Sequence, residues 1–307
     1  MRFSVASSMG LSWAEVKAAT LSAEAYGFDE MLVSDHLEGL MAWDENAGVL
    51  DGPVLLGALA SITDTLGLRI LVSPITMRHP VLLARALQTV DLIAGGRVTI
   101  GVGAGWSPDE HERFGIEFPK FSDRVAALED ACDTIKQLWE SAEPVHKSGI
   151  YPLRGAKLVP RPSTTRAPLL VGGASDASIE LAARYATRWN VLGAPGFVRG
   201  RIEVLRAAER LYGRADAVEV TVTRMAVFVE ESEDFSYPIT VTEGPQPQRR
   251  YALAGEEYQT MYVGPADGFA ADVQEYAAAG VDRIVLPVSA PYIDGQIKTY
   301  AQACGLV

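Results

Sequence analysis

The feature that most constrains the fold is an alternation of short apolar segments with longer amphipathic ones, repeated eight times along the 307 residues. Such short segments are typical of strands buried on both faces, and the longer ones of helices that bury one face. The predicted strands are Arg2–Ser7, Glu30–Ser34, Leu68–Ser73, Val98–Val102, Pro168–Val171, Arg188–Val191, Val218–Val229 and Arg283–Pro287. The predicted helices are Ser12–Tyr26, Val54–Thr65, Val81–Ala94, Arg124–Glu140, Ala177–Ala186, Phe197–Tyr212, Gly268–Ala279 and Tyr292–Cys304. The pattern predicts an α/β protein with a parallel sheet, closed as a (β/α)8 TIM barrel.

The connections between these segments indicate where chemistry is to be sought. Glycine follows the helix at Gly27, Gly95 and Gly280, where it can adopt the left-handed cap before the next strand. In a barrel these joints lie at the N-terminal face, so function is expected at the C-terminal face. The long connections expected at that face are insertions over 35–52, 107–122 and 230–264, and a further excursion over 144–167 is expected to form a small hairpin. We expect one domain over residues 1–307, with an insertion near 230–262 that matches no known pattern.

Composition and charge exclude several classes of partner. The net charge is −12 and the basic residues are scattered, so a nucleic-acid surface is not expected. Residues 1–30 lack a signal peptide or membrane span, and Cys132 and Cys304 suit a reducing compartment, so a cytoplasmic protein is expected. The four histidines form no ligand-spaced pair, so we expect no metal.

Two candidate sites follow predicted strands two and four. His36 comes after Ser34 and Asp35, and an imidazole at a barrel mouth can move a proton near neutral pH; a surface histidine is the alternative. The run GVGAGW, from Gly101 to Trp106, could admit a planar ligand against the backbone beside an aromatic wall. A tight exit turn without a ligand explains the same glycines.

A third candidate site follows predicted strand five. An apolar strand runs into Gly172 and Gly173, and Ser175 and Asp176 open the next helix. Free backbone N–H groups and the positive end of the helix dipole favour an anion there, so the junction predicts a phosphate site. A plain helix cap is the alternative.

Five stretches, in order and at fitting distances, resemble the luciferase-like monooxygenase superfamily and its branch of deazaflavin (coenzyme F420)-dependent oxidoreductases. They are GFDEMLVSDH, LVSPITMRHPVLLARALQTVDLIAGGRVTIGVGAGW, EHERFGIEFP, VGGASDASIELAARYATRWN and AGVDRIVLP. The resemblance covers residues 1–215 well and 264–287 adequately. It implies a barrel with a flavin-type ring across its C-terminal mouth.

The resemblance also implies roles for individual residues. His36 is expected to be the catalytic histidine that faces the reactive edge of the ring, and the peptide between Leu71 and Val72 is expected to be a non-prolyl cis bond behind the ring. The expected cofactor-binding residues are Leu71, Val72, Ser73, Gly103, Ala104, Gly105, Val171, Gly172, Gly173, Ala174 and Ser175. The expected substrate-pocket residues are Ser7, Asp35, Trp106 and His111.

The implied function is hydride transfer between F420 and a small organic substrate. Family members that oxidise sugar phosphates carry a glutamate where this chain has Trp106, which argues against that substrate. An FMN-dependent monooxygenase on the same barrel and a non-catalytic flavin-binding barrel are the alternatives. We also expect a homodimer.

Overall fold

The computed structural model describes residues 1–39, 48–228, 261–289 and 293–307. Its main sheet is a closed parallel barrel, since β1 pairs with both β2 and β13 and the sheet closes where β3 pairs with β5. The barrel strands are β1 (Arg2–Ser7), β2 (Glu30–Val33), β3 (Gly67–Ile70) continued by β4 (Ser73–Pro74), β5 (Val98–Gly103), β8 (Leu169–Gly172), β9 (Arg188–Val191), β10 (Glu219–Thr223) and β13 (Arg283–Val288). The predicted (β/α)8 barrel is confirmed.

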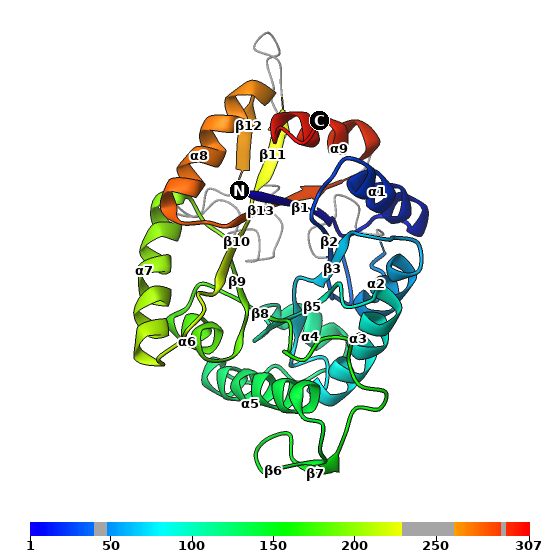
Figure 1. Cartoon of the computed structure of the whole chain (residues 1–307), viewed down its shortest axis with the longest axis vertical. Helices are drawn as coiled ribbons and strands as arrows, with labels where there is room; N and C mark the ends of the chain where they lie inside the picture. Colours follow the sequence, from blue (N-terminus) through cyan, green and yellow to red (C-terminus); the bar gives the residue numbers. More distant parts are fainter. Residues whose placement is uncertain (40–47, 229–260, 290–292) are drawn as a thin grey trace.

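Helices surround this barrel in chain order (Figure 1). They are α1 (Trp13–Ala25), α2 (Gly52–Ala60), α3 (Pro80–Ala94), α5 (Phe121–Glu140), α6 (Asp176–Tyr185), α7 (Pro195–Leu211), α8 (Phe269–Ala279) and α9 (Ile293–Ala303), with the short α4 (Pro108–Arg113) after β5 and a 3₁₀ turn, η3 (Ala266–Gly268), before α8. The glycines expected at the helix-to-strand joints do adopt positive φ, at +79° for Gly27, +63° for Gly95 and +95° for Gly280. No helix in the described part of the chain is long and apolar enough to cross a membrane.

The seventh predicted strand is not continuous, and this part of the prediction is wrong. It divides at Arg224 into β10 and β11 (Met225–Phe228), and β11 leaves the barrel to pair with β12 (Met261–Gly264). Arg224 explains the break, because its backbone N–H donates to Val285 while its guanidinium forms a two-point ion pair with Asp272 on α8. Most of the expected insertion near 230–262 lies outside the described residues.

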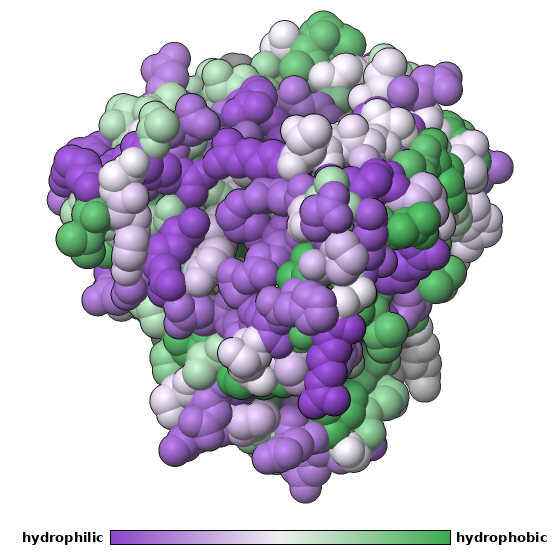
Figure 2. All heavy atoms as spheres, turned by 60° about the horizontal axis from the view of Figure 1, so that its bottom comes forward, coloured by the Kyte–Doolittle hydropathy of each residue, from purple (hydrophilic) through white to green (hydrophobic). Residues whose placement is uncertain are grey.

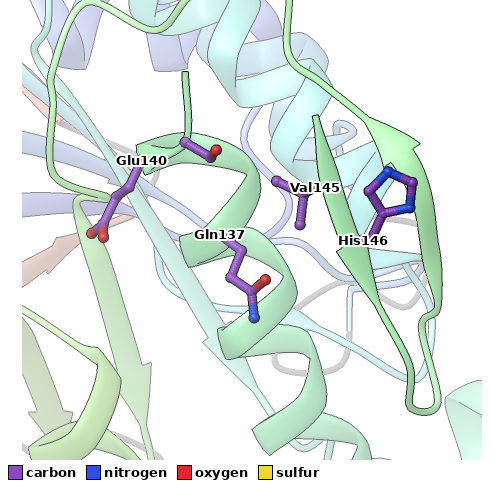
Figure 3. Close-up of a pocket in the computed structure, with 5 residues that line it drawn as sticks. Gln137, Glu140, Val145 and His146 are labelled. Carbon is purple, nitrogen blue, oxygen red and sulfur yellow. The ribbon is translucent and has the colours of Figure 1, made fainter. Parts of the chain in front are cut away.

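The hairpin expected between α5 and the fifth barrel strand is present, as β6 (Val145–Lys147) and β7 (Leu153–Ala156). It is held to α5 by Asp130, which pairs with Lys147 and accepts the Tyr151 N–H at 2.7 Å. A cavity of about 430 Å³ lies between the end of α5 and β6, lined by Gln137, Glu140, Ser141, Val145 and His146 (Figure 3). The end of α5 is at the N-terminal face of the barrel, so this cavity lies away from the end where barrel enzymes carry their chemistry.

The barrel interior is layered by side-chain type. Alternate residues of each strand point inward, and the first inward layer consists of charged residues that pair across the barrel. These are Glu30, Arg69, Arg188, Glu219 and Arg283. Two residues beyond Glu30 and Arg283 on their strands, Leu32 and Val285 are fully buried. The interior is therefore packed, and the C-terminal mouth is the end left for a ligand.

Candidate active site

The loop after β2 and the short helix α4 meet through His36 and Glu110. The His36 Nδ1 atom lies 3.0 Å from Glu110 Oε2 and 3.2 Å from Oε1, and the Leu37 N–H donates to Oε1 at 2.5 Å. Burial disfavours a charge on Glu110, but the hydrogen bonds from His36 and Leu37 outweigh it and hold the pKa of Glu110 below its usual value. An ionised Glu110 assigns the ring proton to Nδ1 and leaves Nε2 as the second ring nitrogen.

Glu110 is a candidate site residue that the sequence pattern did not indicate. It lies three residues after Ser107, which caps α4 through the Glu110 N–H, so its spacing is typical of an ordinary helix start. A carboxylate in the long loop after strand four, at the same mouth as His36, was the available signal. The partner of this carboxylate depends on how the loops after β2 and β5 lie against each other in the fold. Local sequence pattern does not specify that arrangement.

Trp106 forms a wall beside this pair. Its ring centroid is 5.7 Å from that of His36 at an interplanar angle of 72°, and 41% of the tryptophan is exposed. An edge-to-face contact of this kind fixes the orientation of both rings. A molecule bound at the mouth would meet the indole and the imidazole together.

Val72 lies at the centre of a group of glycines from neighbouring strands. The Leu71–Val72 peptide is cis, as the resemblance implies. A Cβ on Gly103 would lie 2.8 Å from Val72 Cγ2, one on Gly172 would lie 3.1 Å from Cγ1, and one on Gly101 would lie 1.9 Å from the Ile70 carbonyl oxygen. Gly101 and Gly103 therefore make room for protein atoms rather than leave an open face. The half-buried Val72 side chain is the apolar surface that these glycines support.

The chain beyond β5 is held in place at Gly105. Gly105 has φ +79°, and a Cβ there would lie 2.7 Å from Thr76 Oγ1. Arg124 on α5 donates to the Gly105 carbonyl, and Ala104 is half-buried between them. The turn that presents Trp106 is thus fixed from two sides.

The expected phosphate-binding residues lie together at the start of α6. Ser175 is the N-cap, accepting the Ser178 N–H at 3.2 Å, and Gly173 has φ +129°. Trp189 donates to the Gly173 carbonyl at 2.8 Å, while the Gly173 N–H donates to Asn190. The Gly173 N–H is already used, so an anion here would be held by the first N–H groups of α6, which have no intrahelical partner. Both the cap and the anion interpretation are consistent with this geometry.

Three residues that were expected to contact a ligand are buried and form hydrogen bonds within the protein. Asp35 is 3% exposed and forms a two-point ion pair with Arg78, at 2.6 and 2.7 Å, rather than contacting the His36 ring. The Ser73 hydroxyl donates to Asp35 at 2.5 Å. The two ring nitrogens of His111 lie 2.6 Å from the Ser107 carbonyl and 2.8 Å from Thr76 Oγ1. With these partners, Asp35, Ser73 and His111 hold loops together, and their contacts with a ligand stay predictions.

Ser7 has a different environment from these three residues. A small hollow of about 10 Å³, about the room of one water molecule, lies at the ends of β1 and β2, and it is lined by Ser7, Ser8, Met9, Gly10, Leu11, Val16, Ser34, Val49, Leu50 and Leu55. The Ser7 hydroxyl donates to the Leu32 carbonyl at 3.3 Å, so it can still accept a hydrogen bond. Hydroxyl and aliphatic groups dominate this hollow.

The fold and this site define a barrel enzyme with an imidazole–carboxylate pair and an aromatic wall at the C-terminal mouth. Residues 1–237 match the model of the luciferase-like monooxygenase family, and the chain belongs to that family of oxidoreductases and monooxygenases. The expected family membership is confirmed.

Individual proteins are similar over part or all of the chain. The F420-dependent glucose-6-phosphate dehydrogenase of Beutenbergia cavernae is 34% identical over 172 residues, 55% of this chain and 50% of the relative. Pyrimidine monooxygenase RutA of Escherichia coli is 30% identical over 177 residues, 55% of this chain and 47% of the relative. The chain thus spans about half the length of the curated relatives it matches. The crystal structure of an F420-dependent secondary alcohol dehydrogenase with an F420–acetone adduct has a TM-score of 0.84 at 22% identity, covering 100% of this chain and 98% of that one, which shows a shared fold.

Proposed function

We propose that this protein is an F420-dependent oxidoreductase that transfers a hydride between the deazaflavin and a small organic substrate. The observation that carries the proposal is the His36–Glu110 pair beside Trp106 at the barrel mouth. The F420-dependent relative and the motifs of the F420 branch in this sequence support the choice of cofactor.

The residues at the mouth fit a flat ring with a phosphate-bearing side chain. Val72, resting over Gly103 and Gly172, offers an apolar surface without a charged group, which suits the face of an aromatic ring. The start of α6, with its free N–H groups after Gly173, suits a phosphate. In this assignment Ala104, Gly105 and the backbone from Val171 to Ser175 line the cofactor.

A bound deazaflavin would supply the hydride-accepting or hydride-donating carbon. His36 would handle the accompanying proton, because its Nδ1 is committed to Glu110 and Nε2 remains to take a proton from an alcohol or to give one to a carbonyl. The Glu110 carboxylate would stabilise the imidazolium that forms. Trp106 would restrict the direction from which the substrate approaches the deazaflavin ring.

The substrate that fits this proposal is a small neutral molecule. Trp106 stands where sugar-phosphate-oxidising members of the family carry a glutamate, and the hollow next to Ser7 is lined by hydroxyl and aliphatic groups. We propose a cytoplasmic homodimer as its working form.

A binding titration tests the cofactor. F420 is expected to bind and FMN is not, as followed by the visible spectrum of the ligand and by quenching of protein fluorescence. Tight binding of FMN with substrate-dependent oxygen consumption would instead establish the monooxygenase alternative, the class of activity of the pyrimidine monooxygenase RutA. Binding of F420 without hydride exchange to any carbonyl or alcohol tested would favour the non-catalytic barrel.

His36→Ala tests the catalytic role. Loss of a general acid–base group is expected to lower turnover by about 10²-fold or more with the F420 dissociation constant changed less than about twofold. His146→Ala is the matched control, because His146 is exposed on the β6–β7 hairpin and should leave both quantities unchanged. Unchanged turnover in His36→Ala would remove His36 from the mechanism.

A further inference from the structure

Asp35, the residue just before His36, has a buried carboxylate that needs hydrogen-bond partners within the protein. A buried carboxylate without a partner is energetically costly. Three hydrogen bonds satisfy it, one from Ser73 and two from Arg78. The Asp35 side chain is thereby directed to Arg78, and the ring contacts Glu110 instead.

Arg78 connects three separate segments at the barrel mouth. Its Nε and Nη2 atoms bind Asp35, and Nη2 also donates at 2.5 Å to Asp51, whose carboxylate caps α2 through the Val54 N–H. The hydrogen bonding that Arg78 donates to Asp35 is the main cause that raises the pKa of the Arg78 guanidinium above its ordinary value, so the group stays charged. One cation therefore holds both the start and the end of the connection from β2 to α2.

The packing around Asp35 leaves little freedom for an alternative arrangement. A Cβ on Gly52, the first residue of α2, would lie 2.9 Å from the Ser34 carbonyl oxygen and 3.0 Å from Asp35 Oδ1. The start of α2 thus lies directly against the Asp35 side chain. On the other side of the loop, Leu37 and His36 are bonded to Glu110, so the imidazole sits between two fixed points.

We propose that Arg78 is a positioning residue for His36, acting through Asp35. By neutralising and holding Asp35, it leaves Glu110 as the carboxylate that sets the ring's proton on Nδ1. Among the described residues, the charged groups on the segments that hold the ring include Asp35 and Glu38 on its own loop, Arg78 on the loop before α3, and Glu110 and Arg113 on α4, where Arg113 pairs with Glu38 at 2.8 Å. This proposal deepens the role given to His36 in the proposed function and rests on it for its catalytic consequence.

The test reads the His36 ring directly, in the protein without cofactor. Nitrogen-15 NMR of histidine side chains distinguishes the two neutral tautomers, and the chain has four histidines, so His36→Gln assigns the signal. The wild-type ring is expected to carry its proton on Nδ1, facing Glu110. Arg78→Met should give a mixture of tautomers, because the adjacent residue Asp35 is then a carboxylate without its arginine partner.

Two further variants separate this electrostatic role from simple support of the fold. Asp35→Asn combined with Arg78→Met removes the unpaired charge and is expected to restore the wild-type tautomer. Arg85→Met is the matched control, since Arg85 is on α3 and bonds to Gln88 and the Val159 carbonyl, away from Asp35. If Arg78→Met does not fold, Arg78→Gln, which removes the charge but keeps a hydrogen-bond donor, is measured in its place.

A folded Arg78→Met or Arg78→Gln protein with the wild-type His36 signal would overturn the proposal, as would a double variant that leaves the tautomer mixed. In turnover assays Arg78→Met should lower kcat by at least about tenfold with the F420 dissociation constant unchanged. Because the NMR readout needs neither cofactor nor substrate, failure of the proposed function would leave it intact, and failure of the Arg78 role would leave F420 binding intact.

Discussion

At the residue scale, the property of His36 that matters is the identity of its partner. Glu110 is fully buried and accepts hydrogen bonds from both the ring and the neighbouring backbone, so its charge is held where the imidazolium would form. Glu110→Gln keeps the shape but removes that charge, and we expect kcat to fall by about 10²-fold with little change in F420 affinity. Steady-state kinetics with a binding titration measure both. Equal loss in kcat and in F420 affinity would mean that Glu110 only supports the fold.

The glycines at the barrel mouth permit a matched pair of substitutions. Gly101→Ala places a Cβ 1.9 Å from the Ile70 carbonyl oxygen, which is backbone and cannot move aside, so we expect a loss of at least about 3 kcal/mol in the free energy of unfolding. Gly57→Ala, inside α2, meets only Val90 at 3.8 Å and should stabilise the protein by about 0.5–1 kcal/mol. Urea denaturation measures the two. Similar midpoints would contradict the tight approach at Gly101.

At the element scale, the strands are joined inside the barrel by ion pairs as well as by hydrogen bonds. Glu30 on β2 pairs with Arg69 on β3 and with Arg188 on β9, the latter at 2.5 Å. Burial disfavours the charged carboxyl, but the arginines Arg69, Arg188 and Arg283 outweigh it and hold the pKa of Glu30 below its usual value. Strands far apart in sequence are thus fixed in register by one buried group.

Glu30→Gln tests this layer through its pH dependence. A lowered folded-state pKa means that the contribution of Glu30 is fully present above the unfolded carboxyl value and is lost as the pH falls through the folded value. We therefore expect Glu30→Gln to cost about 3–5 kcal/mol at pH 7 and to show a shallower loss of stability in acid than the wild type. Chemical denaturation from pH 7 downward measures both. The control is Glu129→Gln, an exposed partner of Arg184, and acid curves parallel to wild type in Glu30→Gln would contradict the prediction.

The same scale shows why some elements were predictable from sequence and others were not. The barrel strands and helices follow from periodicity, because each buries its own apolar face against its neighbours. The break at Arg224 depends on Asp272 in α8, 48 residues away, and the Glu110 contact depends on His36, 74 residues away. The contact of Gly103 with Val72 was not predictable, because a glycine shows only that a side chain is missing and Val72 comes from the connection between β3 and β4; the contact of Gly103 with the cofactor stays a prediction.

At the scale of the whole molecule, the surface is mostly hydrophilic and its apolar residues are unevenly placed. Figure 2 shows hydrophobic side chains gathered on the right, the side that carries α1, α2 and α3 in Figure 1. On that side Val54 at the start of α2 and Leu82 at the start of α3 are 73% and 69% exposed. Neighbouring exposed aliphatic residues on adjacent helices are typical of a surface that pairs with another protein, and a second copy of this chain is the occupant we propose.

Sedimentation equilibrium tests this homodimer. The wild type is expected at twice the chain mass of 33.0 kDa, and Val54→Asp combined with Leu82→Asp should sediment at the single mass, because two desolvated carboxylates on each copy would face apolar surface in the pair. Leu211→Asp is the control, since Leu211 is 79% exposed at the end of α7 on the left side of Figure 1. A wild type of single mass would contradict the dimer, and dissociation by Leu211→Asp alone would place the interface on α7. F420 binding by the monomeric variant would then show that each barrel holds a complete site, because every residue assigned here to the cofactor comes from one chain.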